Sequence, residues 1–216
     1  MTLAVQFTDV SGSSLEVSKL VTVGAPAGAS AANVSADQIW TYNPTDGWLK
    51  YYYYKRGSTA EWRKIGETSA TADTFAPGTS FFFVRGTSGT ATTLTLSGAV
   101  KPLSETASYS IGAGDTIMMC HPWPYAVAVK DFGNFFASGS PAGASAANVS
   151  ADQIWRYDAT NGWTKYYYYK RGTTAQWRLV GGAAEETNAE IPSGEGFFFV
   201  RGTSGDSATI SFSGTL

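Results

Sequence analysis

Short runs of alternating apolar and polar residues, separated by turn residues, follow one another along this chain. Polar and apolar side chains alternate over residues 38–42, and the continuous apolar run at 81–84 ends at Arg85-Gly86. A period of two is typical of β-strands, because successive side chains point to opposite faces of a sheet. No stretch shows a sustained period of 3.6 residues, so the pattern predicts an all-β chain. The strands expected in the first half are 2–10, 15–23, 38–42, 48–54, 60–66, 81–84 and 92–96.

Turn residues mark the connections between these strands. Residues 43–47 end in Asp-Gly, and residues 158–162 end in Asn-Gly. Both dipeptides supply the positive φ angles that a tight hairpin favours. Two longer stretches are expected to be loops, namely the small-residue segment 24–33 and the polar segment 67–80.

The pattern occurs twice along the chain. Residues 50–57, Lys-Tyr-Tyr-Tyr-Tyr-Lys-Arg-Gly, return unchanged at 165–172. Such long identity within one chain indicates that one unit is used twice. The aligned segments are 26–66 with 141–181, identical at 32 of 41 positions, and 81–89 with 197–205, identical at all nine.

The number and spacing of the strands predict the fold class. Seven short strands in about 100 residues, with turn signals between them, are typical of a sandwich or barrel. We therefore expect an all-β tandem repeat of two similar antiparallel β-sandwich or barrel-like units. The expected division is a first unit at 1–98, a connection at 99–114 and a second unit at 115–216.

The two units differ where they begin. The second is expected to start with a strand at 116–124, whereas residues 3–10 match the later segment 125–132. The first unit is therefore expected to lack one strand and to expose a sheet edge, which is a template for pairing with a neighbour. The His-Pro-Trp-Pro segment at 121–124 resembles the Asn-Pro-Phe-Pro strands of secreted bacterial β-proteins of undefined role, and this resemblance assigns no function.

Aromatic residues are the main indication of function. Four consecutive tyrosines in an extended strand put two rings on each face of a sheet, whereas an antiparallel sheet commonly leaves one face to water. We therefore expect more ring surface than one unit can bury by itself. The candidate interface or ligand-binding residues are Trp40, Trp48, Tyr51, Tyr53 and Trp62, with their counterparts Trp155, Trp163, Tyr166, Tyr168 and Trp177.

Composition and charge argue against several classes of partner. Charged residues make up 15% of the chain, against roughly 25% in soluble proteins. The net charge is −2, with 15 Lys+Arg and 17 Asp+Glu, which does not favour nucleic acid or an anionic membrane. No stretch approaches the roughly 20 apolar residues of a membrane helix, and positions 1–20 show no signal peptide.

Catalytic chemistry has few candidates in this sequence. Cys120 is the only cysteine and His121 the only histidine, which excludes an intrachain disulfide, a thiolate cluster and a two-histidine metal site. As strand neighbours they point to opposite faces, so Cys120 is interpreted as a small buried hydrophobe and His121 as a surface or satisfied imidazole. Asp37 matches Asp152 and is expected to cap a turn, while two further acids exchange with amides between the copies. We expect no enzyme activity, no metal and no cofactor.

These observations predict a non-enzymatic structural protein that self-assembles through aromatic sheet faces and open strand edges. The expected setting is an extracellular or virion-type assembly, such as a fibre, shell or surface layer, and the expected partners are other copies or a related structural protein. The alternative is a carbohydrate-binding module, because tryptophan and tyrosine rings stack on pyranose faces. Basic residues recur beside the aromatic ones, but the balancing acids argue against single-stranded nucleic acid.

Overall fold

A computed structural model describes residues 2–6, 15–17, 26–75, 79–90, 105–121 and 124–213, with residues 2–6, 15 and 16 described as main chain alone. The described part of the chain is all-β apart from one 3-10 helix, which confirms the expected class. The strand expected at 92–96 lies outside the described residues, as do the ends of the first two expected strands, at 7–10 and 18–23. Residues 2–90 are called the first half below, and residues 105–213 the second half.

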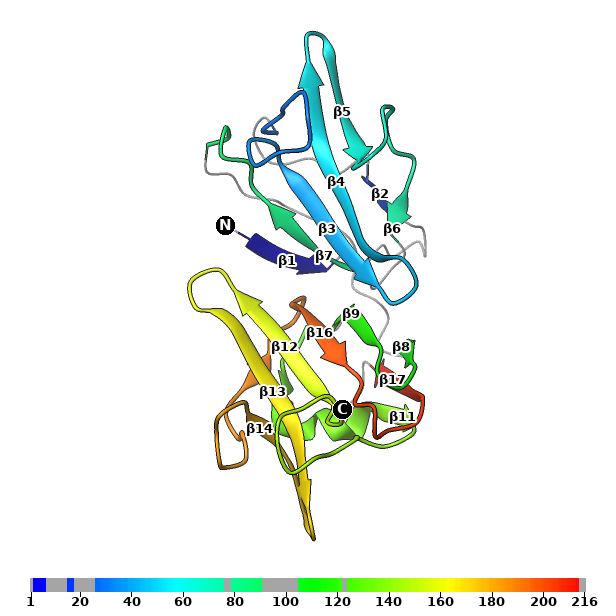
Figure 1. Cartoon of the computed structure of the whole chain (residues 1–216), viewed down its shortest axis with the longest axis vertical. Helices are drawn as coiled ribbons and strands as arrows, with labels where there is room; N and C mark the ends of the chain where they lie inside the picture. The colour runs from blue at the N-terminus through cyan, green and yellow to red at the C-terminus, as the bar shows by residue number, and fades with distance from the viewer. Residues whose placement is uncertain are drawn as a thin grey trace.

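The first half is built on a five-stranded antiparallel sheet with the order β1-β7-β3-β4-β5 (Figure 1). Next to it, two short strands form a separate pair, β2 (Leu15–Glu16) with β6 (Thr74–Phe75). The strands of the large sheet are β1 (Thr2–Gln6), β3 (Gln38–Asn43), β4 (Gly47–Arg56), β5 (Thr59–Lys64) and β7 (Ser80–Val84).

The second half contains two sheets of three or more strands. Its five-stranded sheet has the order β14-β13-β12-β16-β9, and a three-stranded sheet has the order β11-β17-β8. The strands of the larger sheet are β9 (Thr116–Cys120), β12 (Gln153–Asp158), β13 (Gly162–Arg171), β14 (Thr174–Leu179) and β16 (Gly196–Val200). The remaining elements are β8 (Thr106–Ile111), β10 (Val127–Ala128), the helix η2 (Val129–Phe135), β11 (Phe136–Ser138), β15 (Glu190–Ile191) and β17 (Ala208–Ser213).

The predicted hairpin turns are confirmed. Gly47 and Gly162 have φ angles of 70° and 75°, which only glycine adopts without strain. The Asn43 Oδ1 atom accepts hydrogen bonds from the backbone N–H groups two and three residues on, at 2.9 and 2.7 Å. Asp158 does the same in the second half, at 2.9 and 2.8 Å. In each loop, therefore, a side-chain oxygen accepts the backbone hydrogen bonds that close the turn.

Each half has its own hydrophobic core. In the second half, Phe197 and Phe199 of β16 join Phe212 of β17 in one buried cluster between the two sheets, so the architecture is sandwich-like. In the first half, Phe75 is buried in the cluster under the five-stranded sheet. Phe75 belongs to β6, so the segment 67–80, expected to be a polar loop, contains a short strand. The Phe75 ring packs on the core, although the sequence pattern around it is polar.

The segment expected to be a connection contains a strand. Within 99–114, residues 106–111 form β8, which pairs along its whole length with β17. Its side chains alternate, with Thr106, Ser108 and Ser110 exposed and Tyr109 and Ile111 turned toward the core. Small hydroxyl residues on the outer face made the segment resemble a linker, but the period of two is that of a half-buried strand.

The first half does not lack the strand that begins the second. β1 pairs with β7 in the register Thr2↔Val84, and β9 pairs with β16 in the register Thr116↔Val200. The two strands therefore occupy the same place in their sheets. The expected match of 3–10 with 125–132 is wrong, because edge-strand pairing depends on main-chain hydrogen bonds and alternation and leaves side-chain identity free.

The two matched aspartates tie distant loops together. The Asp152 carboxylate is fully buried and accepts hydrogen bonds from Arg201 Nη1 at 2.6 Å, from the Ala142 N–H at 2.8 Å and from the Gly202 N–H at 2.7 Å. In the first half Asp37 makes the same three kinds of contact, including an ion pair with the side chain at position 85. These carboxylates join segments up to 50 residues apart, whereas the expected role was a local turn cap.

The repeated Arg-Gly-Thr-Ser-Gly segments complete these connections. A Cβ atom on Gly86 would lie 2.3 Å from the carbonyl oxygen of Ser35, and one on Gly202 would lie 2.3 Å from that of Ser150. Two backbones therefore meet at a distance that only glycine permits. The Ser204 hydroxyl donates a hydrogen bond to the same Ser150 carbonyl at 2.6 Å. Close packing therefore requires glycine at both matching positions.

Replacing Asp152 by Asn should strongly destabilise the protein. The variant leaves the buried Arg201 guanidinium without its counter-charge, and breaking such a pair typically costs about 3–5 kcal/mol. The measurement is the free energy of unfolding from a urea titration followed by circular dichroism. Asp206→Asn is the matched control, because Asp206 is exposed and a surface change of this kind stays within about 0.5 kcal/mol. Equal stability of the two variants would contradict this role.

Candidate functional site

The tyrosine strands divide their rings between two faces, as predicted. Tyr51 and Tyr53 pack on the core of the first half, while Tyr52 and Tyr54 contact each other edge to face on the opposite side. β13 repeats the arrangement. Six of the ten candidate residues consequently lie in or against the two cores, namely Tyr51, Tyr53, Trp62, Tyr166, Tyr168 and Trp177.

The other four candidates meet on the opposite face of the sheets, where the two halves touch. Trp40 and Trp155 pack there against a small buried cluster of Phe82, Met118 and Phe198. Sequence reasoning missed the two phenylalanines, although alternation along the Phe-Phe-Phe-Val strands puts the middle ring on the face opposite its neighbours. We call this surface the aromatic patch, and its rings are Trp40, Tyr42, Trp48, Phe82, Trp155, Tyr157, Trp163 and Phe198.

Two stacked rings form the centre of the aromatic patch. The Phe82 and Phe198 ring centroids are 6.0 Å apart, with 26° between the ring planes. The Trp48 centroid lies 5.8 Å from that of Phe198, and the Trp163 centroid lies 6.2 Å from that of Phe82. Each tryptophan therefore contacts the phenylalanine of the other half. Ring pairs of this kind contribute roughly 0.5–1.5 kcal/mol each beyond the area that they bury.

On either side of this centre, corresponding elements of each half extend toward the other half. In Figure 1 the tip of the β3–β4 hairpin points toward the second half, and the tip of the β12–β13 hairpin points toward the first. β9 contacts β3 and β7, while β1 contacts β12 and β16. One edge strand of each large sheet, β1 or β9, thus lies against the other half.

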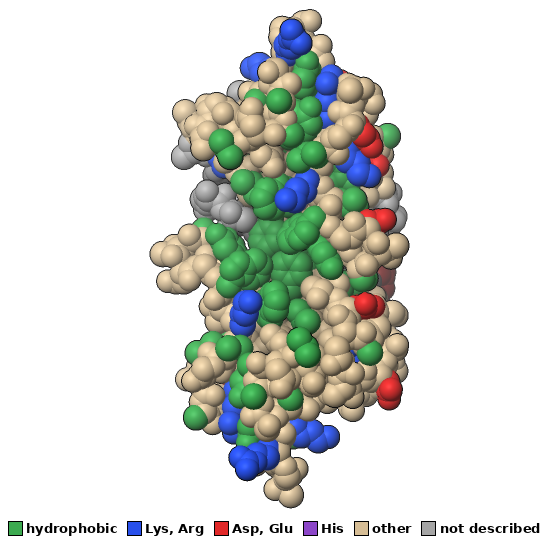
Figure 2. Space-filling view, viewed as in Figure 1, with side chains coloured by type: hydrophobic (Ala, Val, Ile, Leu, Met, Phe, Trp, Pro, Cys, Tyr) green, Lys and Arg blue, Asp and Glu red, His purple; other side chains and the backbone are tan. Residues whose placement is uncertain are grey.

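The aromatic patch is only partly covered by the protein. Phe82 and Phe198 are each 5% exposed, whereas Trp48 is 44% and Trp163 is 46% exposed. Figure 2 shows hydrophobic side chains gathered at the middle of one face, between the two halves, with Lys or Arg side chains above and below them. The two indoles thus lie on a rigid aromatic base with much of their surface open to solvent.

A lysine lies over an indole of the aromatic patch in each half. Lys50 Nζ is 4.0 Å from the centroid of the Trp40 ring and 5.9 Å from that of Trp48. Lys165 Nζ is 3.7 Å from the centroid of the Trp155 ring. Both ammonium groups are held over an indole face by cation–π attraction. The aromatic patch therefore carries fixed positive charge at two matching positions.

Farther from the centre, the rings on this face are covered by arginine. The Arg63 guanidinium lies 3.5 Å from the centroid of the Tyr54 ring, and Arg178 lies 3.5 Å from that of Tyr169. Arg63 also pairs with the Glu61 carboxylate at 2.6 Å. Arginine therefore covers a matching tyrosine ring in each half.

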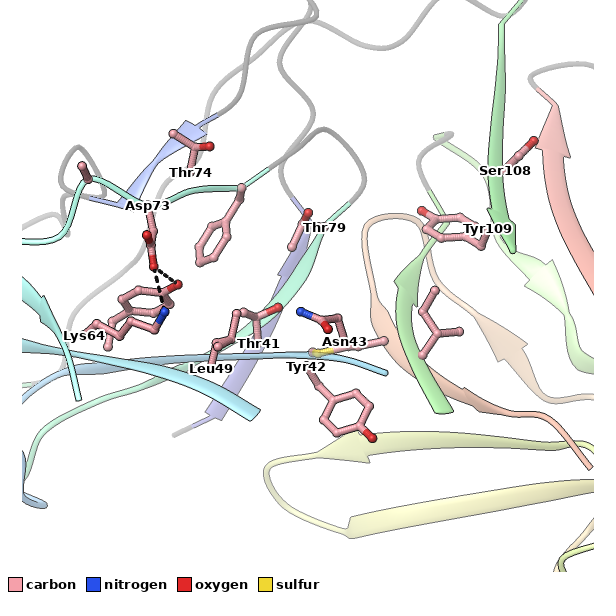
Figure 3. Close-up of a pocket in the computed structure, with 15 residues that line it drawn as sticks. Thr41, Tyr42, Asn43, Leu49, Lys64, Asp73, Thr74, Thr79, Ser108 and Tyr109 are labelled. Carbon is pink, nitrogen blue, oxygen red and sulfur yellow. Dashed lines mark hydrogen bonds and ion pairs between the residues drawn. The ribbon is translucent and has the colours of Figure 1, made fainter. Parts of the chain in front are cut away.

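A cavity of about 800 Å³ lies elsewhere between the halves (Figure 3). On its wall, the Tyr51 hydroxyl donates a hydrogen bond to the Asp73 carboxylate at 2.8 Å, and Lys64 Nζ lies 3.6 Å from the same carboxylate. Burial, and then the hydrogen bond to Asp73, raise the pKa of the Tyr51 phenol well above its ordinary value. The phenol therefore stays protonated at neutral pH and cannot act as a base there.

The neighbouring Cys120 and His121 are both buried. Burial lowers the pKa of His121 to about 4 and raises the pKa of Cys120 to about 11. At pH 7 the imidazole is therefore neutral and the thiol is protonated. His121 is fully buried, with its ring centroid 4.6 Å from that of Tyr125 and 5.3 Å from that of Phe212. A surface position, one of the two expected for this residue, is therefore wrong.

In the part of the chain that the structure describes, no group of three or more His, Cys, Asp or Glu side chains could hold a metal ion. Within the same residues, no helix has the length and apolar character needed to cross a bilayer.

Comparison with known proteins gave no relatives. No protein-family model, no curated protein and no solved structure matches the chain. The aromatic patch must therefore be interpreted from its own geometry.

Truncation of Phe198 and of Trp163 should have different effects on stability. Phe198→Ala leaves a cavity between the halves and should cost about 3–5 kcal/mol of unfolding free energy. Trp163→Ala removes a ring that is already half in water, so a cost of about 1–2 kcal/mol is expected. Chemical denaturation followed by circular dichroism measures both values. A cost for Trp163→Ala as large as that for Phe198→Ala would show that the exposed indole is chiefly structural.

The low pKa of His121 predicts a specific acid instability. Unfolded chains bind a proton at this residue below about pH 6.5, while the native protein binds it only below about pH 4. The unfolded state therefore binds more protons between these values, and stability should fall as the pH drops from 6.5 to 4. An NMR titration of the single imidazole tests this directly. A native-state midpoint near 6.5 would contradict it, and His121→Gln should flatten the dependence of stability on pH in this window.

Proposed function

We propose that the protein is a non-enzymatic carbohydrate-binding module of an extracellular or virion-type structure, and that it binds sugar through the aromatic patch. The observation that carries this proposal is the pair of half-exposed indoles, Trp48 and Trp163, held on a common aromatic base. Flat apolar rings pack well against the C–H face of a pyranose, and neighbouring polar groups bind its hydroxyls. Rigid support keeps the entropic cost of binding low.

The size of the open surface also favours a narrow ligand. A tryptophan side chain buries at most about 250 Å², so two indoles that are 44% and 46% exposed present roughly 200 Å² between them. A stable protein interface takes about 800 Å² from each partner. Six of the ten candidate rings lie in or against the two cores, and the exposed remainder suits a chain of sugar rings better than a second protein.

Self-assembly remains the second candidate. The observation that favours it is the matching composition of the aromatic patch, which takes Trp40, Tyr42, Trp48 and Phe82 from one half and their counterparts from the other. A surface that is symmetric in this way can contact the same surface of another copy. Large exposed apolar patches are also common at protein interfaces.

We further propose that the two halves are two copies of one sandwich unit. The large sheets share their strand order and the registers of their matching strands, such as Ile39↔Phe83 and Ile154↔Phe199. On this interpretation the contact at Phe82 and Phe198 resembles a homodimer interface contained within one chain. A ligand that crosses this contact meets similar surroundings on both sides.

The function is tested by glycan-array binding with the Trp48→Ala, Trp163→Ala double variant. Loss of two stacking platforms worth about 1 kcal/mol each should weaken binding at least tenfold. The control is Val34→Ala, Val149→Ala, because these two valines are 73% and 74% exposed but lie outside the aromatic patch. Unchanged binding in the tryptophan variant would contradict the proposal. A wild-type protein that binds no glycan but forms oligomers in light scattering, lost in the same variant, would support self-assembly.

A further inference from the structure

We infer that the preferred saccharide is acidic, with a uronate-type sugar whose ring stacks on Trp48 or Trp163 and whose carboxylate is bound by Lys50 or Lys165. This inference rests on the proposed function and specifies its ligand class. The juxtaposition that carries it is an exposed indole with an ammonium group 5.9 Å from its centroid, as measured at Trp48. A ring stacked on the indole would bring a carboxylate on its rim within reach of the lysine.

The strand geometry places a lysine and an exposed tryptophan on the same face of the sheet in both halves. Lys50 follows Trp48 by two residues on β4, so the two side chains leave the same face of the sheet. Lys165 and Trp163 have the same relation on β13. Each lysine also crosses to a neighbouring strand, where it lies over Trp40 or Trp155. The ammonium groups are therefore positioned before any ligand binds.

The charges of these lysines are not neutralised by nearby acids. Among the described residues, Lys50 and Lys165 make no ion pair. Several other basic residues do: Arg63 pairs with Glu61, Lys64 with Asp73, Arg85 with Asp37, Arg156 with Glu195 and Arg201 with Asp152. The two lysines contact indoles instead, which leaves their N–H donors and charges available to an anionic group.

The acids closest in sequence are already held within the hairpin turns. The Asp46 carboxylate accepts a hydrogen bond from Asn43 Nδ2 at 3.0 Å. Asp158 accepts from two backbone N–H groups of its own turn, and these hydrogen bonds lower the pKa of its carboxyl, so it stays ionised and occupied. Figure 2 shows acidic side chains along one edge of the view and none within the hydrophobic area. The ligand therefore meets two cations on an otherwise neutral surface.

The two positions act together on a polymer. The Trp48 and Trp163 centroids each lie 5.8 Å from that of Phe198, so both indoles flank one ring. A single extended chain of sugars can contact both, with one acidic group for each lysine. Binding to two linked positions on one polymer is stronger than binding to either alone.

Single-stranded nucleic acid fits this arrangement less well. It needs a positively charged groove that follows a phosphate at every nucleotide, whereas the aromatic patch offers two ammonium groups and the chain has a net charge of −2. Widely spaced carboxylates on a sugar polymer match two lysines better. An oligonucleotide is therefore included in the test as the competing ligand.

The test compares polygalacturonate with its fully methyl-esterified form, which has the same sugar rings without the charge. The wild-type protein should bind the acid form at least tenfold more tightly at low salt, and this preference should disappear at about 0.5 M salt, where charges are screened. Lys50→Gln, Lys165→Gln should abolish this preference. The control Lys55→Gln, Lys170→Gln removes the same charge from exposed lysines outside the aromatic patch and should keep the preference.

Each outcome supports or overturns the inference. Equal binding of acid and ester by the wild-type protein would overturn it while leaving carbohydrate binding intact. Binding to neither polymer would also overturn it, and the glycan array then decides the proposed function separately. Tighter binding of a thymidine oligonucleotide than of polygalacturonate would also overturn the inference, because the lysines would then bind phosphate groups and not sugar carboxylates. Circular dichroism of each variant confirms that altered binding does not come from unfolding.

Discussion

The contact between Phe82 and Phe198 is the interaction on which the rest of the arrangement depends. These rings are nearly buried, and they come from β7 and β16, which lie beside the edge strands β1 and β9. Beside these stacked rings, β1 and β9 each lie against the large sheet of the other half. The same contact brings both hairpin tips across the boundary, so that Trp48 and Trp163 are supported by rings of the other half.

The buried aspartates fix the loops behind this contact. Asp37 and Asp152 hold the chain that follows β7 and β16 against the chain that precedes β3 and β12. These strands are neighbours in the sheets and carry Phe82 and Phe198 at the boundary. A buried carboxylate with all its hydrogen bonds satisfied adds little net stability but imposes one geometry, since an alternative packing would leave its charge unpaired.

Alternation along the chain was enough to predict the all-β class, the hairpins and the division of the tyrosines between two faces. It could not show that the outer face of one sheet is covered by the other, because Phe82 has its partner 116 residues away. Sequence similarity also placed 3–10 against 125–132, although β1 takes the position of β9. An edge strand carries few side-chain requirements, and β8, with serines and threonine on its outer face, had the composition of a linker. The missing information was the three-dimensional pairing, which no local pattern contains.

The outer faces of the two sheets show three ways of dealing with aromatic surface, and their difference points to function. Phe82 is hidden by the other half, and Tyr54 is covered by the guanidinium of Arg63. Trp48 has neither kind of cover over nearly half of its surface. A smaller residue at this position would keep the core of the contact and expose less apolar area to water, so folding alone does not require an indole there. Because the same large ring stands open at both matching positions, the part that remains uncovered is where binding of another molecule would compensate the cost of its exposure.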